Sequence, residues 1–258
     1  MTPKSAAKIQ IDRRYQVWEI MYIFASLNLP DLTAFHYPLL VLTAYLIGSV
    51  SNAIWIGKFF WGVDVRQSGS FSAGANNVQR ILGWKAALPV FFLDIGKGVL
   101  AVCLVFITDF EPETNSFVGF QIGLGFAAIV GHIFPLFFRF RGGKGVATIA
   151  GVILAIHPYA ALICLTVFLI CFLLTRYISV GSIVAATCFP CLVNSMFALW
   201  LQPEETLTLK IFSIVVAALI WVTHARNIVR IFQGKEEKFV LRRTPPIEDN
   251  LALRQILQ

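Results

Sequence analysis

The stretch AALPVFFLDIGKGVLAVCLVFIT, residues 86–108, decides the fold class of this chain. Its apolar run is long enough to cross the hydrocarbon core of a bilayer, which takes about 20 residues of α-helix. Only Asp94 and Lys97 are charged within it. Charged residues inside a membrane-crossing helix are functional candidates by default. These two stand three positions apart on one helix face and can neutralise each other, so we interpret them as a structural ion pair.

Apolar stretches of the same kind recur on both sides of residues 86–108. Hydrophobic residues make up 57% and charged residues 14% of the 258 positions, against about 45–50% and about 25% in soluble domains. By hydropathy, the further spans lie near residues 38–60, 117–138, 146–156, 159–175, 180–201 and 207–224. The sequence therefore predicts an all-α, polytopic membrane protein with about seven transmembrane helices.

The domain organisation follows from where these spans begin and end. We expect a membrane-embedded domain over residues 37–232, a basic or amphipathic N-terminal extension over 1–36 and a basic cytosolic tail over 233–258. The extension holds an apolar run after several cations, but Glu19 interrupts that run and no A-x-A-like cleavage site follows. We interpret it as a helix lying on the membrane rather than as a cleavable signal.

The fourth span, residues 146–156, is too short to cross a core of about 30 Å at about 1.5 Å per residue. It either starts inside the membrane or pairs with the fifth span as a tight hairpin at His157-Pro158; fusion of the two spans into one helix is the alternative. With seven spans, these cationic positions share one face: Arg66, Arg80, Lys85, Arg139, Arg141, Lys144, Arg176 and the run from Arg226 to Arg243. Lys and Arg favour the cytoplasmic side in short loops, and fusion would export the basic tail. We therefore expect an external N-terminus and a cytosolic C-terminus.

Several classes of chemistry find no support in the sequence. The net charge of +7 is explained by cytosolic loops facing anionic lipid, without nucleic acid. The cysteines lie in apolar stretches, no Cys/His set has zinc-ligand spacing, and G-x-S-x-G and His-Asp acyltransferase signatures do not occur. A Walker A loop is excluded because Lys144 is followed by Gly145 and Phe138 replaces its first glycine. We expect no metal or other cofactor, and no obligate protein partner is evident.

Two glycine-containing segments lie on the predicted cytosolic face. The first, VDVRQSGSFSAGANNVQR (63–80), has Gly69 and Gly74 for unusual turns and offers polar side chains: Ser70, Ser72, Asn76, Asn77, Arg66 and Arg80. The second, FRGGKGVAT (140–148), opens a helix directly. Glycine amides at a helix N-terminus attract anions, and Lys144 adds a point charge suited to phosphate. The alternative is that these cations only set the topology, but three glycines around one lysine favour a phosphate site.

Two further segments reach the same face. RYISVGS (176–182) adds a cation and two hydroxyls, although Ser179 or Ser182 could instead cap the sixth span. HARNIVR (224–230) places His224 and Asn227 on neighbouring positions of one helix face. His132, near the end of the third span, is a candidate catalytic group, but helix-end hydrogen bonding explains it more simply.

These motifs, with AYLIGS (44–49), GVDVR (62–66), FLDIGKG (92–98) and GHIFP (131–135), follow one another in a fixed order from about Tyr45 to Phe239. In order and spacing they resemble the bacterial acyl-phosphate:glycerol-3-phosphate acyltransferase (PlsY) family. The resemblance implies a seven-helix enzyme of the bacterial cytoplasmic (inner) membrane with its active site on the cytosolic face. Such an enzyme moves a fatty acyl chain from acyl phosphate to glycerol 3-phosphate and yields lysophosphatidic acid for phospholipid biosynthesis.

The resemblance also assigns roles to residues of this chain. It implies a catalytic set of Ser70, Lys144, Ser182 and His224, and a set that binds substrate and phosphate, Asn77, Arg80, Gly142, Gly143, Gly145 and Asn227. Lys144 and the amides of Gly142 to Gly145 would hold phosphate, with Arg80 as a second clamp. Ser182 and Asn227 would orient glycerol phosphate. The expected partners are acyl phosphate, glycerol 3-phosphate and membrane lipids.

The chain departs from the family pattern at four positions. Phe71, Ser72 and Asn76 replace Gly, Asn and Thr in the first motif, and Arg226 replaces an acid beside Asn227. We expect the bulky Phe71 to fill space that glycine leaves open. Because of these departures, a non-catalytic acyltransferase homologue is an alternative to an active enzyme. A small-solute transporter is a second alternative, but it predicts a polar path and internal repeats, and neither is clear in the sequence.

Overall fold

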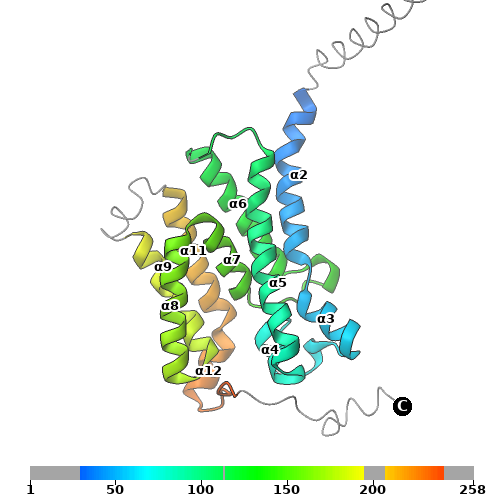
Figure 1. The fold of residues 1–258 in the computed structure, drawn as a ribbon, viewed down its shortest axis with the longest axis vertical. Helices are drawn as coiled ribbons and strands as arrows, with labels where there is room; N and C mark the ends of the chain where they lie inside the picture. The colour runs from blue at the N-terminus through cyan, green and yellow to red at the C-terminus, as the bar shows by residue number, and fades with distance from the viewer. Residues whose placement is uncertain (1–29, 113, 195–206, 241–258) are drawn as a thin grey trace, which may run out of the picture. The chain divides into compact units, whose positions relative to one another are not determined.

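A computed structural model describes residues 30–112, 114–194 and 207–240, and its regular elements there are all helices (Figure 1). The main helices are α2 (Pro30–Ser49), α3 (Asn52–Trp61), α4 (Ala75–Leu82), α5 (Trp84–Cys103), α6 (Asn115–Ile133), α7 (Val146–Ile156), α8 (Pro158–Thr175), α9 (Ile178–Val193), α11 (Leu207–Thr223) and α12 (Ala225–Phe232). Short 3-10 turns cover Val65–Gln67, Leu104–Ile107 and Leu136–Phe138. The predicted all-α class is confirmed. Most of the predicted extension and parts of the sixth span and basic tail lie outside the described residues.

The chain divides into two compact units, Met1–Leu39 and Leu40–Gln258. In the described part of the first unit, the rings of His36 and Tyr37 meet edge to face with centroids 5.5 Å apart. All the contacts described below lie within the second unit.

Three helical stretches are long and apolar enough to cross a membrane on their own: Trp84–Ile107, Asn115–Phe138 and Pro158–Thr175. Two bent pairs pass the same test together, Phe35–Ser49 with Asn52–Trp61 (42°) and Leu207–Thr223 with Ala225–Phe232 (54°). Two apolar helices, Val146–Ile156 and Ile178–Val193, are shorter. The described residues thus hold three candidate spans, or five with the bent pairs. Every stretch predicted to be a span contains a helix, but seven full spans are not established.

The first predicted span, residues 38–60, is broken between α2 and α3. The Ser49 hydroxyl donates to the Tyr45 carbonyl (2.9 Å), a side-chain bond that competes with the helix ladder and bends helices. Lys97 Nζ donates to the Val50 carbonyl at 2.8 Å, which satisfies a backbone group released by the break. An unpaired carbonyl in an apolar surrounding costs free energy, so the Lys97 side chain makes this bend tolerable.

The predicted break between the fourth and fifth spans is confirmed. α7 ends at Ile156, α8 begins at Pro158, and Figure 1 shows α8 running back beside α7. His157 Nδ1 accepts a hydrogen bond from the Ala160 amide (3.2 Å) and caps α8, while proline suits the first helical position because its missing N–H needs no partner there. The fused helix is not formed.

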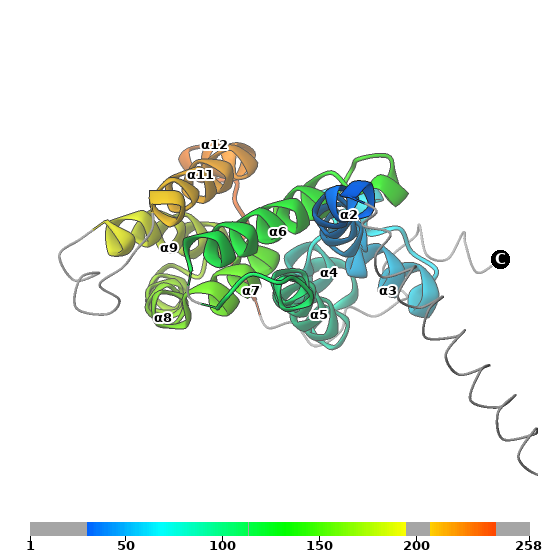
Figure 2. The same cartoon turned by 90° about the horizontal axis from the view of Figure 1, so that it is seen from above.

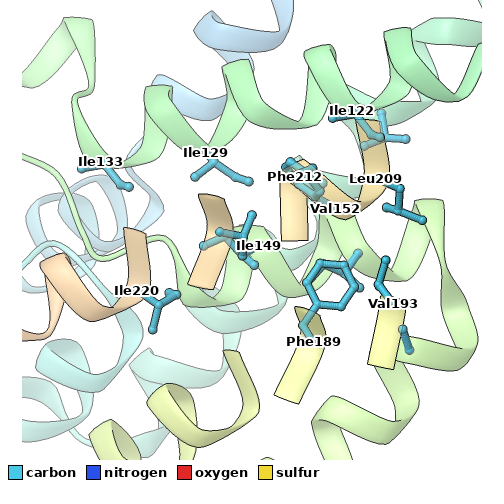
Figure 3. Packing of buried hydrophobic residues seen from close by; sticks show 14 of the residues in the cluster. Ile122, Ile129, Ile133, Ile149, Val152, Phe189, Val193, Leu209, Phe212 and Ile220 are labelled. Carbon is cyan, nitrogen blue, oxygen red and sulfur yellow. The ribbon is translucent and has the colours of Figure 1, made fainter. Parts of the chain in front are cut away.

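The largest buried apolar cluster joins α6, α7, α9 and α11 (Figure 3). Its members include Ile129, Val152, Phe189 and Phe212. Figure 2 shows α7 between α5 and α8. At the contact of α5 with α7, a Cβ added to Gly151 would lie 2.1 Å from the Ile95 carbonyl oxygen, so glycine permits the close backbone approach typical of membrane helices.

Most of the polar loops gather at one end of the helices. In Figure 1 the segment before α4, the α8–α9 turn and α12 lie at the lower end, the α6–α7 loop lies above them, and the α5–α6 connection lies at the upper end. Of the apolar window of α8, only 6% is buried within the protein. A helix so apolar and so exposed requires lipid around it, and the loops therefore present a polar site at one edge of a membrane-embedded bundle.

Candidate functional site

The α6–α7 loop brings Lys144 to α12. Lys144 Nζ donates a hydrogen bond to Asn227 Oδ1, and Asn227 Nδ2 donates to Glu236 Oε1 at 2.7 Å. Burial lowers the pKa of Lys144 to about 8; the Glu236 charge opposes this shift, and the neighbouring Arg230 and Arg80 charges reinforce it. The loop thus places a lysine whose charge is only partly compensated beside two arginines.

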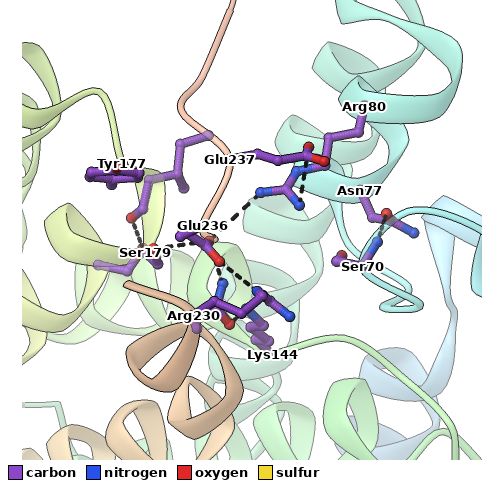
Figure 4. A network of polar contacts seen from close by, with 12 residues as sticks. Ser70, Asn77, Arg80, Lys144, Tyr177, Ser179, Arg230, Glu236 and Glu237 are labelled. Carbon is purple, nitrogen blue, oxygen red and sulfur yellow. Dashed lines mark hydrogen bonds and ion pairs between the residues drawn. The ribbon is translucent and has the colours of Figure 1, made fainter. Parts of the chain in front are cut away.

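Glu236 is the acidic centre of this group of cations (Figure 4). Its side chain is only 2% exposed. It accepts hydrogen bonds from Arg230 Nε (2.7 Å), Asn227 Nδ2 (2.7 Å) and Ser179 Oγ (3.3 Å), and Arg80 Nη2 lies 3.7 Å from Oε1. Burial alone would raise the pKa of Glu236, but hydrogen bonds from Arg230 and Asn227 and the nearby positive charges lower it overall. Glu236 therefore ties α12 to α4 and α9.

Glu236 was not predicted as a site residue. It lies in the KEEK run (235–238) of the tail, for which the sequence indicated only a basic character. A signal was present in Gly234, which follows α12 and has a φ of +66°. A left-handed glycine just past a helix terminates it and turns the chain back. The Lys235 amide accordingly donates to the Arg230 carbonyl at 2.7 Å, and the next residue enters the site.

The first predicted segment forms a loop held from inside by Asn77. Asn77 is buried; its Oδ1 accepts from the Ser70 amide (2.7 Å), and its Nδ2 donates to the carbonyls of Val65 (2.6 Å) and Ser68 (3.2 Å). Asn77 was expected to bind substrate or phosphate, but here its amide group is used to shape the loop. Gly69 has a φ of +64°, a conformation that glycine adopts without strain.

The glycines before Lys144 are also engaged with the protein. The Gly142 amide donates to the Ile133 carbonyl and the Gly143 amide to the His132 carbonyl, each at 3.2 Å. These amides were expected to hold phosphate; in the structure they fasten the loop to the end of α6. Gly145 remains as the residue preceding α7, with a φ of +82°. The anion-binding capacity of this loop therefore centres on Lys144 and the N-terminus of α7.

Ser182 and His224 lie on α9 and at the end of α11. The Ser182 hydroxyl donates to the Ile178 carbonyl (2.9 Å), and Ser179 contacts Glu236, so neither serine caps α9 by a side-chain hydrogen bond. His224 Nδ1 lies 2.9 Å from the Ile220 carbonyl oxygen. Because a carbonyl only accepts, this contact places the proton on Nδ1 and leaves Nε2 as an acceptor.

Two cavities of about 130 Å³ each adjoin at this end of the bundle. The first is lined by residues from four polar segments, among them Ser70, Asn77, Lys144, Gly145, Ser182 and His224. The second is apolar and includes Ile153, Leu165 and Phe189. Phe91, Val146, Ala147, Phe168 and Ser182 line both. A cavity that holds Lys144, Asp94 and several neutral polar side chains thus shares part of its wall with an apolar cavity.

The ten predicted site residues fall into three groups. Six of them line the polar cavity: Ser70, Asn77, Lys144, Gly145, Ser182 and His224. Arg80 and Asn227 join the site through Glu236 and Lys144, whereas Gly142 and Gly143 support it from behind. In the described ranges, no three His, Cys, Asp or Glu residues group so as to hold a metal ion.

The four departures from the family pattern differ in exposure: Ser72 and Asn76 are partly exposed and line the polar cavity, whereas Phe71 and Arg226 are exposed. Phe71 has a φ of +58° and is 66% exposed, and it does not line the polar cavity. The expectation that its ring fills space left by glycine is therefore wrong. Arg226 is exposed on α12, whereas its neighbour Asn227 is buried.

The fold and the site together define a helical membrane protein in which a cavity lined by many polar side chains adjoins an apolar cavity. The family model for glycerol-3-phosphate acyltransferase matches residues 38–234, and the chain belongs to this family. It is 38% identical to the glycerol-3-phosphate acyltransferase of Chlorobaculum parvum, with 79% of this chain and 97% of the relative aligned. It is 42% identical to that of Staphylococcus carnosus, with 78% and 96% aligned.

A solved structure gives the same result for the fold. The crystal structure of PlsY (YgiH), an integral membrane glycerol 3-phosphate acyltransferase, in its glycerol 3-phosphate form, is similar with a TM-score of 0.69 and 37% identity. The comparison covers 79% of this chain and 96% of that one. The lysophosphatidic acid form of the same protein is similar with a TM-score of 0.67 and 36% identity.

Proposed function

We propose that this chain transfers a fatty acyl group from acyl phosphate to the 1-hydroxyl of glycerol 3-phosphate, giving lysophosphatidic acid and inorganic phosphate. The observation that carries the proposal is the shared wall between the polar cavity and the apolar cavity. An acyl phosphate is itself divided in this way, with an anionic head and an apolar chain. Membership of the glycerol-3-phosphate acyltransferase family supports the acceptor.

Lys144, Arg80 and Arg230 bind the phosphate groups of the two substrates. Lys144 lines the polar cavity, and Arg80 and Arg230 flank Glu236, which Asn227 links to Lys144. Lys144 holds the phosphate of the acyl donor, and Arg80 acts as the second clamp. Ser182 and Asn227 orient glycerol 3-phosphate, and Ser70 assists at the hydroxyl or phosphoryl oxygen. Charge-assisted contacts of this kind are the strong ones for phosphate.

The reaction needs positioning more than a strong protein base. The acceptor oxygen forms a bond to the acyl carbon, the bond from that carbon to the bridging phosphate oxygen breaks, and the hydroxyl proton passes to a phosphate oxygen. The mixed anhydride is already activated, so orientation and stabilisation of developing negative charge carry the catalysis. His224 Nε2 accepts a hydrogen bond from the 2-hydroxyl of glycerol 3-phosphate and so helps to aim the 1-hydroxyl, whose proton passes to the phosphate oxygen, at the acyl carbon.

The site belongs on the cytosolic side of a bacterial inner membrane, with seven helices, the N-terminus outside and the C-terminus inside. Charge supports this orientation, because Lys144, Arg80 and Arg230 gather around Asn227 and Glu236 and cations favour the cytoplasmic side.

The test is the choice of acyl donor by the purified, folded protein. Labelled glycerol 3-phosphate is incubated with palmitoyl phosphate and, separately, with palmitoyl-CoA. The proposal predicts lysophosphatidic acid from palmitoyl phosphate alone. Product from palmitoyl-CoA alone contradicts the donor assignment, and no product from either donor favours a non-catalytic homologue or a transporter.

A further inference from the structure

A buried polar cluster lies beside the glycine-lysine loop, at the inner wall of the polar cavity. Asp94 and Lys97 come from α5, His132 from α6 and Thr148 from α7; they are exposed by 2%, 7%, 6% and 0%, respectively. Asp94 and His132 line the cavity together with Lys144. The proposed mechanism assigns no role to these buried groups.

The charges of the cluster are neutralised and hydrogen-bonded. Lys97 Nζ lies 2.9 Å from Asp94 Oδ1, as predicted for a structural ion pair, and Asn52 Nδ2 donates to the same oxygen at 2.9 Å. A buried ion pair is tolerated only with such additional partners. The pair therefore fixes Asp94 Oδ1 in one place, between the α2–α3 bend and α6.

His132 stands between this fixed carboxylate and the glycine-lysine loop. Its Nδ1 lies 3.1 Å from Thr148 Oγ1 and 3.8 Å from Asp94 Oδ1. The opposite edge of the ring faces the loop, since a Cβ added to Gly143 would lie 2.3 Å from Nε2. The His132 carbonyl also accepts the Gly143 amide. The loop therefore rests on His132 through both the ring and the backbone.

We propose that His132 is a positioning residue for the phosphate site. Held at Nδ1 by Thr148 beside the Asp94–Lys97 pair, the ring fixes Gly143 and thereby sets where the Lys144 ammonium meets substrate phosphate. The inference rests on the proposed function, because it assigns the phosphate to Lys144. It also explains why glycine is required at position 143, where the imidazole leaves no room for a side chain.

Thr148 offers the mildest way to test this role. Thr148→Val keeps the shape of the side chain and removes only the hydroxyl that contacts His132, whereas Thr148→Ser keeps the hydroxyl. Thr187→Val is the matched control, because the Thr187 hydroxyl also makes hydrogen bonds, to the Ile183 carbonyl and from Trp221, but lies on α9 and lines neither cavity.

The readout is the dissociation constant for glycerol 3-phosphate, measured by calorimetry on the full chain in detergent, together with KM and kcat. We expect Thr148→Val to weaken binding about tenfold, the equivalent of about one buried hydrogen bond. KM should rise more than kcat falls. Thr148→Ser should bind like wild type, and Thr187→Val should match wild type at an equal folded fraction.

The proposal is overturned if Thr148→Val binds glycerol 3-phosphate as wild type does, or if Thr148→Ser fails to restore binding. If Thr148→Val does not fold, His132→Asn is measured in the same way, because it keeps an amide near Thr148 but removes the ring edge from Gly143; wild-type binding by that variant overturns the proposal. If wild type transfers the acyl group and Thr148→Val binds glycerol 3-phosphate equally well, the role of His132 is refuted and the proposed function stands. If wild type neither binds glycerol 3-phosphate nor transfers the acyl group, both the role of His132 and the proposed function are refuted.

Discussion

Replacement of Glu236 by glutamine removes the one carboxylate that Arg80, Arg230 and Asn227 share. Arg230 Nε and Asn227 Nδ2 each donate to it at 2.7 Å. Breaking a buried ion pair by removing one partner costs about 3–5 kcal/mol. The Arg230 and Arg80 side chains are 32% and 17% exposed, so water recovers part of this loss. We therefore expect Glu236→Gln to lower the free energy of unfolding by about 2–3 kcal/mol.

Thermal unfolding in detergent, followed by circular dichroism, checks this magnitude. A loss of this size should lower Tm by about 5–10 °C. Glu237→Gln is the matched control, because Glu237 is 73% exposed and pairs only loosely with Arg80 at 3.6 Å. An exposed pair of this kind is worth at most about 1 kcal/mol. Equal effects of the two substitutions would refute the role given to Glu236.

The pH dependence of the free energy of unfolding tests the role of Glu236 independently. The folded-state pKa of Glu236 is lowered, because the hydrogen bonds from Arg230 and Asn227 outweigh burial. Its stabilisation is therefore present above the unfolded-state value of about 4.3 and is lost as pH falls through the folded-state value. The stability gap between wild type and Glu236→Gln should be constant from neutral pH to about pH 5 and shrink below about pH 4.

Three further predictions concern the loop and the cavities. Gly143→Ala should lose folded yield and turnover, because its Cβ would lie 2.3 Å from His132 Nε2, whereas Gly123→Ala, with nothing within 4 Å, should retain both in a solubilisation and activity assay. Turnover should fall as pH rises through the Lys144 pKa of about 8, and Lys144→Arg should move this fall to higher pH; an unchanged profile contradicts the requirement for a charged lysine. Ala185→Phe, in the apolar cavity, should slow transfer from palmitoyl phosphate by about tenfold or more while the glycerol 3-phosphate dissociation constant stays unchanged.

Hydropathy was sufficient to place the helices, because each long apolar run can be satisfied only by a helix in lipid. The break at His157-Pro158 was predicted from the short length of the fourth span and from charge, because fusion of the fourth and fifth spans would export the basic tail. Hydropathy did not predict the bend between α2 and α3. That bend depends on Lys97, which lies far away in the sequence and satisfies the Val50 carbonyl.

The candidate site was predictable at the level of side-chain chemistry and less so at the level of partners. Lys144, Ser182 and His224 do line one cavity, since the topology carries their segments to one end. The engagement of the Gly142 and Gly143 amides with α6 depends on tertiary packing, which motif spacing does not reveal. The burial of Glu236 likewise depends on the turn at Gly234, and composition alone describes that region only as basic.

The role of Lys144 in acyl transfer from acyl phosphate is tested by the turnover of palmitoyl phosphate with glycerol 3-phosphate by purified Lys144→Ala. Lys210→Ala is the control, because Lys210 lies in α11 and lines neither cavity. With both variants folded, we predict that Lys144→Ala loses at least about a hundredfold in kcat/KM, the order seen when one key electrostatic donor is removed, while Lys210→Ala stays near wild type. Near-normal turnover by folded Lys144→Ala would show that Lys144 is not needed for acyl transfer.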